Sequence, residues 1–417
     1  MSPLTISTIA PDIDRLFARL DALTAIHPLE PDGACRLALT DADRAGRALF
    51  SRWAQDAGLT LATDAVGNQF ATLPGTDPSL PPVMTGSHLD TVATGGRFDG
   101  ALGVVAAFAV VEAVQRAGLS LAHSLTVANF TNEEGARFAP DMLGSLVHVG
   151  GLSVAEAHAT RSVDGALFGE ELARIGALGE TTPGTITPKC FVELHVEQGP
   201  VLDREGLAIG VVDGVQGISW REVAFAGEAN HAGATPMAMR RDAGYAACAL
   251  AAAVRGLTAR HEGLRATCGR MVLEPNLINV IAERATVTVD LRHPDEQALA
   301  AAEAELDAAI ADAAQSADVQ AAQTVLARFA PVPFDDALAA CIEAAAKARG
   351  LTHTRLISGA GHDAQMLARV APSAMIFAPS IGGISHNPRE ATGRDDIAAA
   401  VAVLADVLVS LALKEQP

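Results

Sequence analysis

The spacing of apolar residues predicts two helices and a hairpin at the start of the chain. Apolar positions recur every three or four residues over 12–23 and 40–57, as in amphipathic helices. Short alternating runs at 59–61 and 68–73 then predict two paired strands.

Beyond residue 80, buried strands alternate with helices. Apolar runs at 82–85, 124–130 and 190–196 predict strands, and a helix is expected over 101–117. Each of these strands leads into a polar segment. Because ligands bind outside the carboxyl ends of the strands in open α/β sheets, the pattern predicts a site at that edge.

The pattern changes after residue 211. Strands are expected at 219–226, 270–280, 285–291 and 319–327, and helices at 240–259, 295–314, 335–350 and 395–413. The four strands and the first two of these helices predict a compact α+β unit inserted into the first domain, and the last two helices follow its exit. We therefore expect a catalytic domain over 1–211 and 331–417, interrupted by an inserted domain over 212–330.

Composition narrows the class of partner. The 417 residues are 49% hydrophobic, and the net charge of −19 argues against nucleic acid or anionic membranes as partners and favours a small-molecule substrate. The five cysteines are scattered without a Cys-x-x-Cys pair, which fits reduced thiols. The apolar runs are shorter than the roughly 20 residues of a membrane span. The N-terminal residues show no export signal, so we expect a cytoplasmic protein.

The segment 86–100 places candidate metal-binding groups among glycines. His88 and Asp90 are two positions apart, so in an extended segment the Asp90 carboxylate can hold the imidazole of His88. Asp99 lies in the turn that follows, where a carboxylate can bridge two cations. An ordinary surface hydrogen bond explains a lone His-x-Asp pair equally well.

Further candidate ligands follow later strands and loops. The adjacent Glu133 and Glu134 repel each other unless a cation or a proton lies between them. Since adjacent side chains point in different directions, one can bind a metal while the other acts as a general base. His195 ends a strand, and His386 lies in a glycine-flanked loop. Taken singly, the acidic pair fits a solvated turn and each histidine fits a structural role.

In combination, these residues form a ligand set for two divalent cations. Three histidines, one bridging aspartate and one glutamate suit Zn²⁺ or a similar ion. Two such ions about 3.5–4 Å apart can activate a water molecule and polarise a carbonyl. The inserted domain adds His231, Asn279 and Arg292, of which Arg292 can bind a substrate carboxylate through two parallel hydrogen bonds or form a surface ion pair.

The motifs resemble the zinc-dependent amidohydrolases that include N-carbamoyl-L-amino acid hydrolases, β-ureidopropionases and allantoate amidohydrolases, within a wider clan of dizinc peptidases. The resemblance extends from about residue 12 to the last helix. It rests on Gly-Ser-His-Leu-Asp-Thr-Val, Gly-Gly-Arg-Phe-Asp-Gly, Thr-Asn-Glu-Glu-Gly-Ala-Arg-Phe, Glu-Leu-His-Val-Glu-Gln-Gly-Pro, His-Ala-Gly-Ala-Thr-Pro-Met, Gly-Ala-Gly-His-Asp-Ala and Ile-Ser-His-Asn-Pro. It implies a dinuclear-metal catalytic domain with a central mixed sheet flanked by helices, and an inserted α+β dimerisation or lid domain.

The resemblance also implies roles for individual residues. His88 and His195 would bind one metal, Glu134 and His386 the other, and Asp99 would bridge both, with Asp90 orienting His88 and Glu133 as general base. The substrate contacts would be Gln198, Gln216, His231, Asn279, Arg292 and His362. His231 would also stabilise an oxyanion, and His231 and Asn279 are candidates for the neighbouring subunit's site in a homodimer.

The expected reaction is metal-dependent hydrolysis of the ureido C–N bond of an N-carbamoyl-L-amino acid, giving amino acid, ammonia and carbon dioxide. Zn²⁺ is the expected metal, with Mn²⁺, Co²⁺ and Ni²⁺ as alternatives. Allantoate or β-ureidopropionate are alternative substrates. A dipeptidase or aminoacylase is more remote, because the peptidases of the clan have a carboxylate where this chain has His195. An inactive metal-binding scaffold would lack a ligand or the base, and none is missing here.

Overall fold

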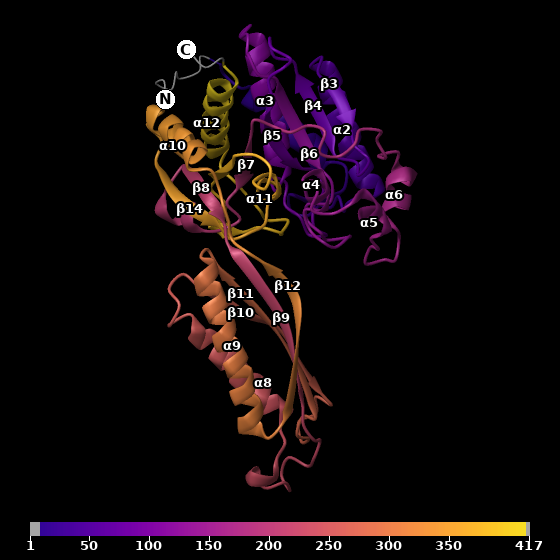
Figure 1. Ribbon diagram of the computed structural model, residues 1–417, viewed down its shortest axis with the longest axis vertical. Coiled ribbons are helices and arrows are strands. Elements are labelled where there is room, and N and C mark those ends of the chain that lie inside the picture. Colours follow the sequence, from indigo (N-terminus) through magenta and orange to yellow (C-terminus); the bar gives the residue numbers. More distant parts are fainter. Residues whose placement is uncertain (1–8, 414–417) are drawn as a thin grey trace. The chain divides into compact units, whose positions relative to one another are not determined.

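Figure 1 shows the computed structural model, which describes residues 9–413. The chain divides into two compact units: the first comprises Met1–Gly214 and Pro333–Pro417, and the second is Val215–Val332. These limits lie within three residues of the boundaries expected for the inserted domain. The role of that domain in dimerisation stays a prediction.

A large mixed sheet forms the centre of the first unit. Within residues 9–413, its nine strands are β3 (Thr60–Thr63), β4 (Gln69–Leu73), β5 (Val83–His88), β6 (Leu125–Phe130), β7 (Cys190–Val196), β8 (Ile209–Val215), β13 (Val332–Pro333), β14 (His353–Ser358) and β15 (Ser373–Ala378). Their order is β13-β8-β15-β7-β5-β6-β4-β3, with β14 paired to β8. The predicted mixed α/β sheet is confirmed.

The central strands of this sheet run parallel. β5 pairs in parallel with β6 and β7, and β7 pairs in parallel with β15. The outer pairings of β4 with β6, β3 with β4, and β8 with β15 are antiparallel. The carboxyl ends of the four central strands therefore lie at one edge, where the sequence predicted a site.

One face of the sheet is covered by long apolar helices. These are α1 (Ile13–Thr24), α3 (Ala101–Arg116), α10 (Asp336–Ala348) and α12 (Arg394–Ala412). Along β7, Val192 and Leu194 belong to the same core cluster as these helices. Because successive side chains of a strand alternate, Glu193 and His195 point to the opposite face. A buried face thus carries the polar groups of the site.

A further long helix, α2, and several shorter elements complete the first unit. They are α2 (Asp41–Asp56), α4 (Leu143–His148), α5 (Val154–Ala159), α6 (Phe168–Ile175), α7 (Val201–Glu205), α11 (Asp363–Leu367), the pair β1 (Pro28–Leu29) and β2 (Gly33–Ala34), and the 3-10 turn η2 (Ile381–Gly383). The predicted second helix begins as its sequence indicates, because the Thr40 side chain accepts the backbone N–H of Asp43.

The second unit is an antiparallel sheet packed against two helices (Figure 1). Its elements are β9 (Gly217–Ala226), β10 (Arg265–Glu274), β11 (Arg284–His293), β12 (Gln320–Phe329), α8 (Ala243–Leu257), α9 (Glu296–Ala317) and the turn η1 (Met237–Met239). The strand order is β10-β11-β9-β12. In β11, buried residues alternate with partly exposed ones, so Asp290 and Arg292 share the face away from the helices' core.

Two predicted elements of this unit begin or end elsewhere. The strand expected over 270–280 ends at Glu274, because Pro275 has no backbone N–H to donate to the ladder. The helix expected from residue 240 begins at Ala243, since the Asp242 side chain caps it by accepting the N–H of Tyr245. Among the described residues, no helix is long and apolar enough to cross a membrane.

Candidate metal centre

Two buried histidines and one aspartate meet at the carboxyl ends of β5 and β7. His88 is the last residue of β5, and its Nδ1 lies 2.9 Å from the backbone oxygen of Asp90. The Nδ1 of His195 lies 2.9 Å from the backbone oxygen of Val196. A carbonyl oxygen only accepts, so Nδ1 carries the proton in both rings. In the neutral rings each Nε2 is then the unprotonated nitrogen, and these atoms lie 3.8 and 3.1 Å from Asp99 Oδ1. The Nε2 of His195 also accepts the backbone N–H of Gly100 at 3.1 Å.

The other oxygen of the same aspartate faces a second group. Asp99 Oδ2 and Glu134 Oε2 each lie 3.3 Å from His386 Nε2. The ligand atoms of each trio, His88–Asp99–His195 and Asp99–Glu134–His386, lie within 4.8 Å of one another. The fold thus brings all five predicted ligands together, as two groups that share Asp99.

The start of α3 makes this approach possible. Gly100 directly follows Asp99 and has φ +61°, a conformation that favours glycine. A Cβ at this position would lie 2.3–2.5 Å from ring atoms of His88. The glycine therefore lets the aspartate turn and the histidine pack closely.

The electrostatics of the cluster fit divalent cations. Burial, together with the charges of Asp99 and Asp90, raises the pKa of Glu134 well above its usual value. Burial and the charge of Asp363 do the same for the pKa of Glu133. Carboxylates crowded away from water stay ionised only if a positive charge lies among them. Imidazole and carboxylate donors of this kind suit Zn²⁺ and related ions, so the residues present fit the predicted pair of metals.

Glu133 lies beside the first trio. Its Oε2 is 3.4 Å from His88 Nε2. The backbone N–H groups of Glu133 and Glu134 donate to the two carboxylate oxygens of Asp90, at 3.2 and 3.3 Å. The prediction that the Asp90 carboxylate holds the imidazole of His88 is therefore wrong. β5 ends at His88, so the extended geometry assumed for this pair does not continue, and Asp90 instead orients His88 through its backbone oxygen and the glutamate loop through its carboxylate.

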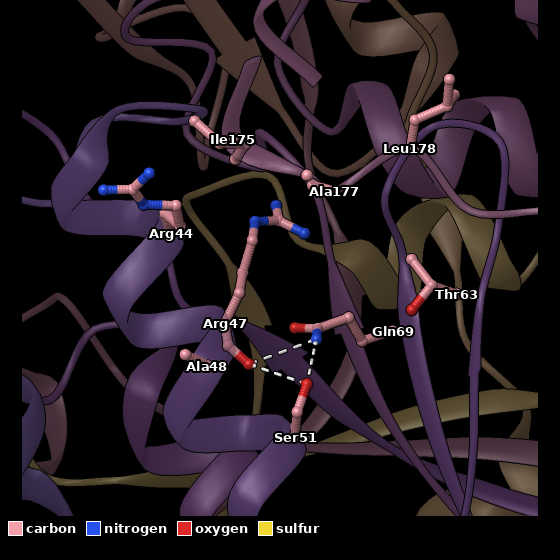
Figure 2. Close-up of a pocket in the computed structure, with 10 residues that line it drawn as sticks. Arg44, Arg47, Ala48, Ser51, Thr63, Gln69, Ile175, Ala177 and Leu178 are labelled. Atoms are coloured by element: carbon pink, nitrogen blue, oxygen red, sulfur yellow. Dashed lines mark hydrogen bonds between the residues drawn. The ribbon is translucent and has the colours of Figure 1, made fainter. Parts of the chain in front are cut away.

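Arg47 of α2 and Asn68 hold the start of the loop that carries Glu133 and Glu134. Arg47 Nη2 donates to Thr131 Oγ1 at 3.1 Å, and Asn68 Oδ1 accepts the N–H of Thr131 at 2.9 Å. Arg47 lines a cavity of about 290 Å³. Figure 2 shows Arg47 beside Ser51 and Gln69. The Gln69 amide donates to Ser51 Oγ and to the Arg47 carbonyl. No predicted site residue lines this cavity.

Two predicted substrate contacts lie at the metal-binding cluster. Gln198 Nε2 donates to Asp99 Oδ2 at 2.9 Å, whereas its buried Oε1 has no hydrogen-bond partner among residues 9–413. The ring of His362 lies 4.6 Å from the ring of His195, and its Nε2 is 2.9 Å from Ser358 Oγ. Burial lowers the pKa of His362 well below its usual value, so its ring is neutral. Both residues stay candidates for substrate binding.

The remaining predicted substrate contacts belong to the second unit. The exposed His231 and Asn279 are neighbours, because the N–H of Ala232 donates to the Asn279 carbonyl. Arg292 donates to the Asp290 carboxylate through Nε and Nη2, at 3.0 and 2.9 Å. Gln216 accepts from Arg265 Nη1 at 3.4 Å. The contacts of these four residues with substrate stay predictions.

Three buried acids around the centre had no role predicted from the sequence, although Glu193 and Asp363 lie within the quoted motifs. Glu193 accepts Ser87 Oγ at 2.6 Å and the N–H of Ala364 at 2.9 Å. Asp363 accepts Ser145 Oγ at 2.6 Å. Glu390 accepts the N–H groups of Phe98 and Asp99. The available signal was their nearness in sequence to His195, His362 and His386.

Comparison with known proteins gives consistent matches along the chain. The model of peptidase family M20/M25/M40 matches residues 84–410. An N-carbamoyl-L-amino-acid amidohydrolase of Rhizobium meliloti is 41% identical, covering 94% of this chain and 94% of that protein. An allantoate amidohydrolase of Bacillus subtilis is 35% identical over 85% of this chain and 87% of its own length.

A solved structure agrees with these matches. The crystal structure of an amidase of the hydantoinase/carbamoylase family from Burkholderia multivorans has a TM-score of 0.94 and 41% identity, covering 98% of this chain and all of that one. The predicted family resemblance, α/β fold and hydrolase class are confirmed. The chain belongs to peptidase family M20/M25/M40 and is a hydrolase of its amidohydrolase branch.

Proposed function

We propose that this protein hydrolyses N-carbamoyl-L-amino acids in the cytoplasm, as a homodimer with two divalent cations per subunit. The observation that carries the proposal is the pair of ligand groups joined by Asp99, with Glu133 beside them. Zn²⁺ is the expected ion, and Mn²⁺, Co²⁺ and Ni²⁺ suit the same donors. Relatives at 41% and 35% identity bear the name N-carbamoyl-L-amino acid amidohydrolase, which supports the choice of substrate.

The chemistry follows from the position of Glu133. Bound in the two ligand groups, cations would polarise the ureido carbonyl and make water acidic enough to be a nucleophile at neutral pH. Glu133, whose pKa is raised by burial, takes a proton from water as oxygen adds to the carbamoyl carbon. It then gives this proton to the leaving amine as the C–N bond breaks. The products are the amino acid and carbamate, which decomposes to ammonia and carbon dioxide.

The substrate's two ends call for different groups. A ureido oxygen that gains negative charge needs a hydrogen-bond donor, the role proposed for His231. The α-carboxylate suits the planar guanidinium of Arg292, whose parallel Nε and Nη2 groups donate to the Asp290 carboxylate in this structure and would exchange that carboxylate for the substrate's. Gln198, Gln216, Asn279 and His362 are proposed to contact the remainder of the substrate.

The surface around His231 supports the proposed dimer. Large apolar side chains are exposed on the two loops that carry His231 and Asn279, with Met237 at 78%, Met239 at 73%, Leu277 at 59% and Ile278 fully exposed. A cluster of exposed apolar residues marks a surface that another protein covers. A second copy of the chain would cover it and bring His231 and Asn279 to the neighbouring subunit's site.

One panel assay tests the proposed substrate. Ammonia release is measured after metal reconstitution with N-carbamoyl-L-amino acids, 3-ureidopropionate and allantoate. We expect the highest kcat/KM with an N-carbamoyl-L-amino acid. A clear preference for allantoate would favour the second candidate, which the 35% identical allantoate amidohydrolase supports. Activity on peptides alone would contradict the proposal.

A further inference from the structure

The segment that follows His386 holds the turn that contains Asp99. The side chain of Glu390 is 2% exposed, and its Oε1 accepts the backbone N–H groups of Phe98 and Asp99 at 2.9 and 3.0 Å. Its Oε2 accepts Ser385 Oγ at 3.1 Å. Both oxygens of this buried carboxylate are therefore hydrogen bonded, as burial of a charge requires.

The same two segments touch at further points. Ser385 Oγ lies 3.4 Å from Asp99 Oδ2, and Thr94 Oγ1 donates to the His386 carbonyl at 3.1 Å. A Cβ at Gly96 would lie 2.2 Å from Glu390 Oε1, so the turn approaches the carboxylate as closely as glycine allows. Segments about 290 residues apart in the chain are thus locked together on either side of the shared ligand.

These contacts matter for the metal centre because they fix the backbone of Asp99. Asp99 serves both trios, so a small rotation of its backbone moves one oxygen away from His195 or the other away from His386. Glu390 fixes the N–H of Asp99 itself and lies only four residues after His386. Groups that orient metal ligands in this way tune affinity without touching the metal.

We propose that Glu390 is a positioning residue of the dinuclear centre. It holds Asp99 and the His386 loop in fixed relative positions, so that one aspartate serves two cations. This inference rests on the proposed function only in taking Asp99 and His386 as metal ligands. It assigns Glu390 no contact with substrate.

Titration of the full-length, chelator-treated protein with Co²⁺ tests the proposal, with calorimetry and visible absorption as readouts. We expect two ions in the wild type. Glu390→Ala should weaken binding of the less tightly held ion by about 10- to 100-fold. Glu390→Gln, which keeps an oxygen for the N–H groups of Phe98 and Asp99, should stay close to the wild type.

Glu112→Ala is the matched control. Glu112 is also a buried carboxylate, 6% exposed, but it pairs with Arg19 on the helical face, at 2.6 Å. Its loss should lower the melting temperature and leave both Co²⁺ affinities unchanged. If Glu390→Ala binds two ions as tightly as the wild type, or if Glu112→Ala loses affinity to the same extent, the proposal is wrong.

A second route avoids the risk that Glu390→Ala does not fold. Gly96→Ala should displace the carboxylate and weaken the same ion, whereas Gly269→Ala, where the nearest side-chain atom lies 3.9 Å from the added Cβ, should not. Unchanged Co²⁺ binding in Gly96→Ala would contradict the proposal, as would a wild type that binds fewer than two ions. A wild type that binds two ions but hydrolyses no ureido compound would contradict only the proposed function.

Discussion

The predicted metal ligands and the predicted substrate-binding residues of the second unit differ in how far the fold has already fixed them. His88 and His195 are 1% exposed, and hydrogen bonds to backbone oxygens set their ring orientation. His231 and Asn279 are exposed on loops surrounded by apolar side chains. These two histidines are held by the fold itself, whereas the exposed loop residues are proposed to be covered by a second copy of the chain. Chemistry is thus proposed at buried strand ends, and recognition is proposed on residues whose surroundings a dimer would complete.

Glu133→Gln should have the largest effect, and it tests whether the buried group of residues carries out the chemistry. Removing a general base should lower kcat by about 10²- to 10⁴-fold. Because the five metal ligands are unchanged, metal content should equal that of the wild type. Steady-state kinetics and elemental analysis measure both quantities. Turnover near the wild-type rate would show that the proton is taken elsewhere.

Arg292→Lys addresses recognition alone. Lysine cannot offer two parallel N–H groups, so KM for an N-carbamoyl-L-amino acid should rise by about 10- to 100-fold with little change in kcat. Arg270→Lys is the control, since Arg270 is exposed in the same sheet and pairs with Glu222 at 3.4 Å. An equal rise in KM for both variants would remove Arg292 from its proposed role.

Ile278→Asp tests whether a second copy covers the exposed loops. A charge in a covered apolar surface should raise the dimer dissociation constant about tenfold or more. Sedimentation velocity at several concentrations measures this change. Val163→Asp is the matched control, because Val163 is 86% exposed in the first unit. A wild-type protein that stays monomeric at all concentrations would contradict the proposed dimer.

Thr40→Ala should give the smallest effect. Loss of this N-cap should lower the free energy of unfolding by about 1 kcal/mol, because the N–H of Asp43 loses its acceptor. kcat/KM should not change, since the metal ligands lie on other elements. Denaturant unfolding and kinetics measure the two quantities. A marked fall in kcat/KM would mean that α2 influences the site through Arg47.

The sequence was most informative where structure is local. Strands such as β7, and caps such as Thr40, follow from periodicity and from a single side chain. The central strand β15 was missed, because its short apolar run closely follows the brief helix α11 and the turn at 368–370. Periodicity alone does not separate such a run from buried helix.

The site residues also divide into those that local sequence predicts and those that only the folded chain reveals. The five proposed metal ligands could be picked out because each lies in a recognisable motif, and the fold brings them together in two groups. The carboxylate of Asp90 was misassigned, since strand geometry was assumed beyond the end of β5. Glu390 was not found, because its partners Phe98 and Asp99 are about 290 residues away and only the folded chain brings them together.

The exposed fractions of the three proposed histidine ligands predict which bound metal ion exchanges with solvent first. The His386 side chain is 50% exposed, whereas His88 and His195 are each 1% exposed. An ion in the group of Asp99, Glu134 and His386 is therefore expected to leave first during dialysis or chelation, and to return first. Loss of metal would then pass through a form of the protein that holds one ion. The metal content measured for a preparation would depend on how it was dialysed or chelated as well as on its metal affinity.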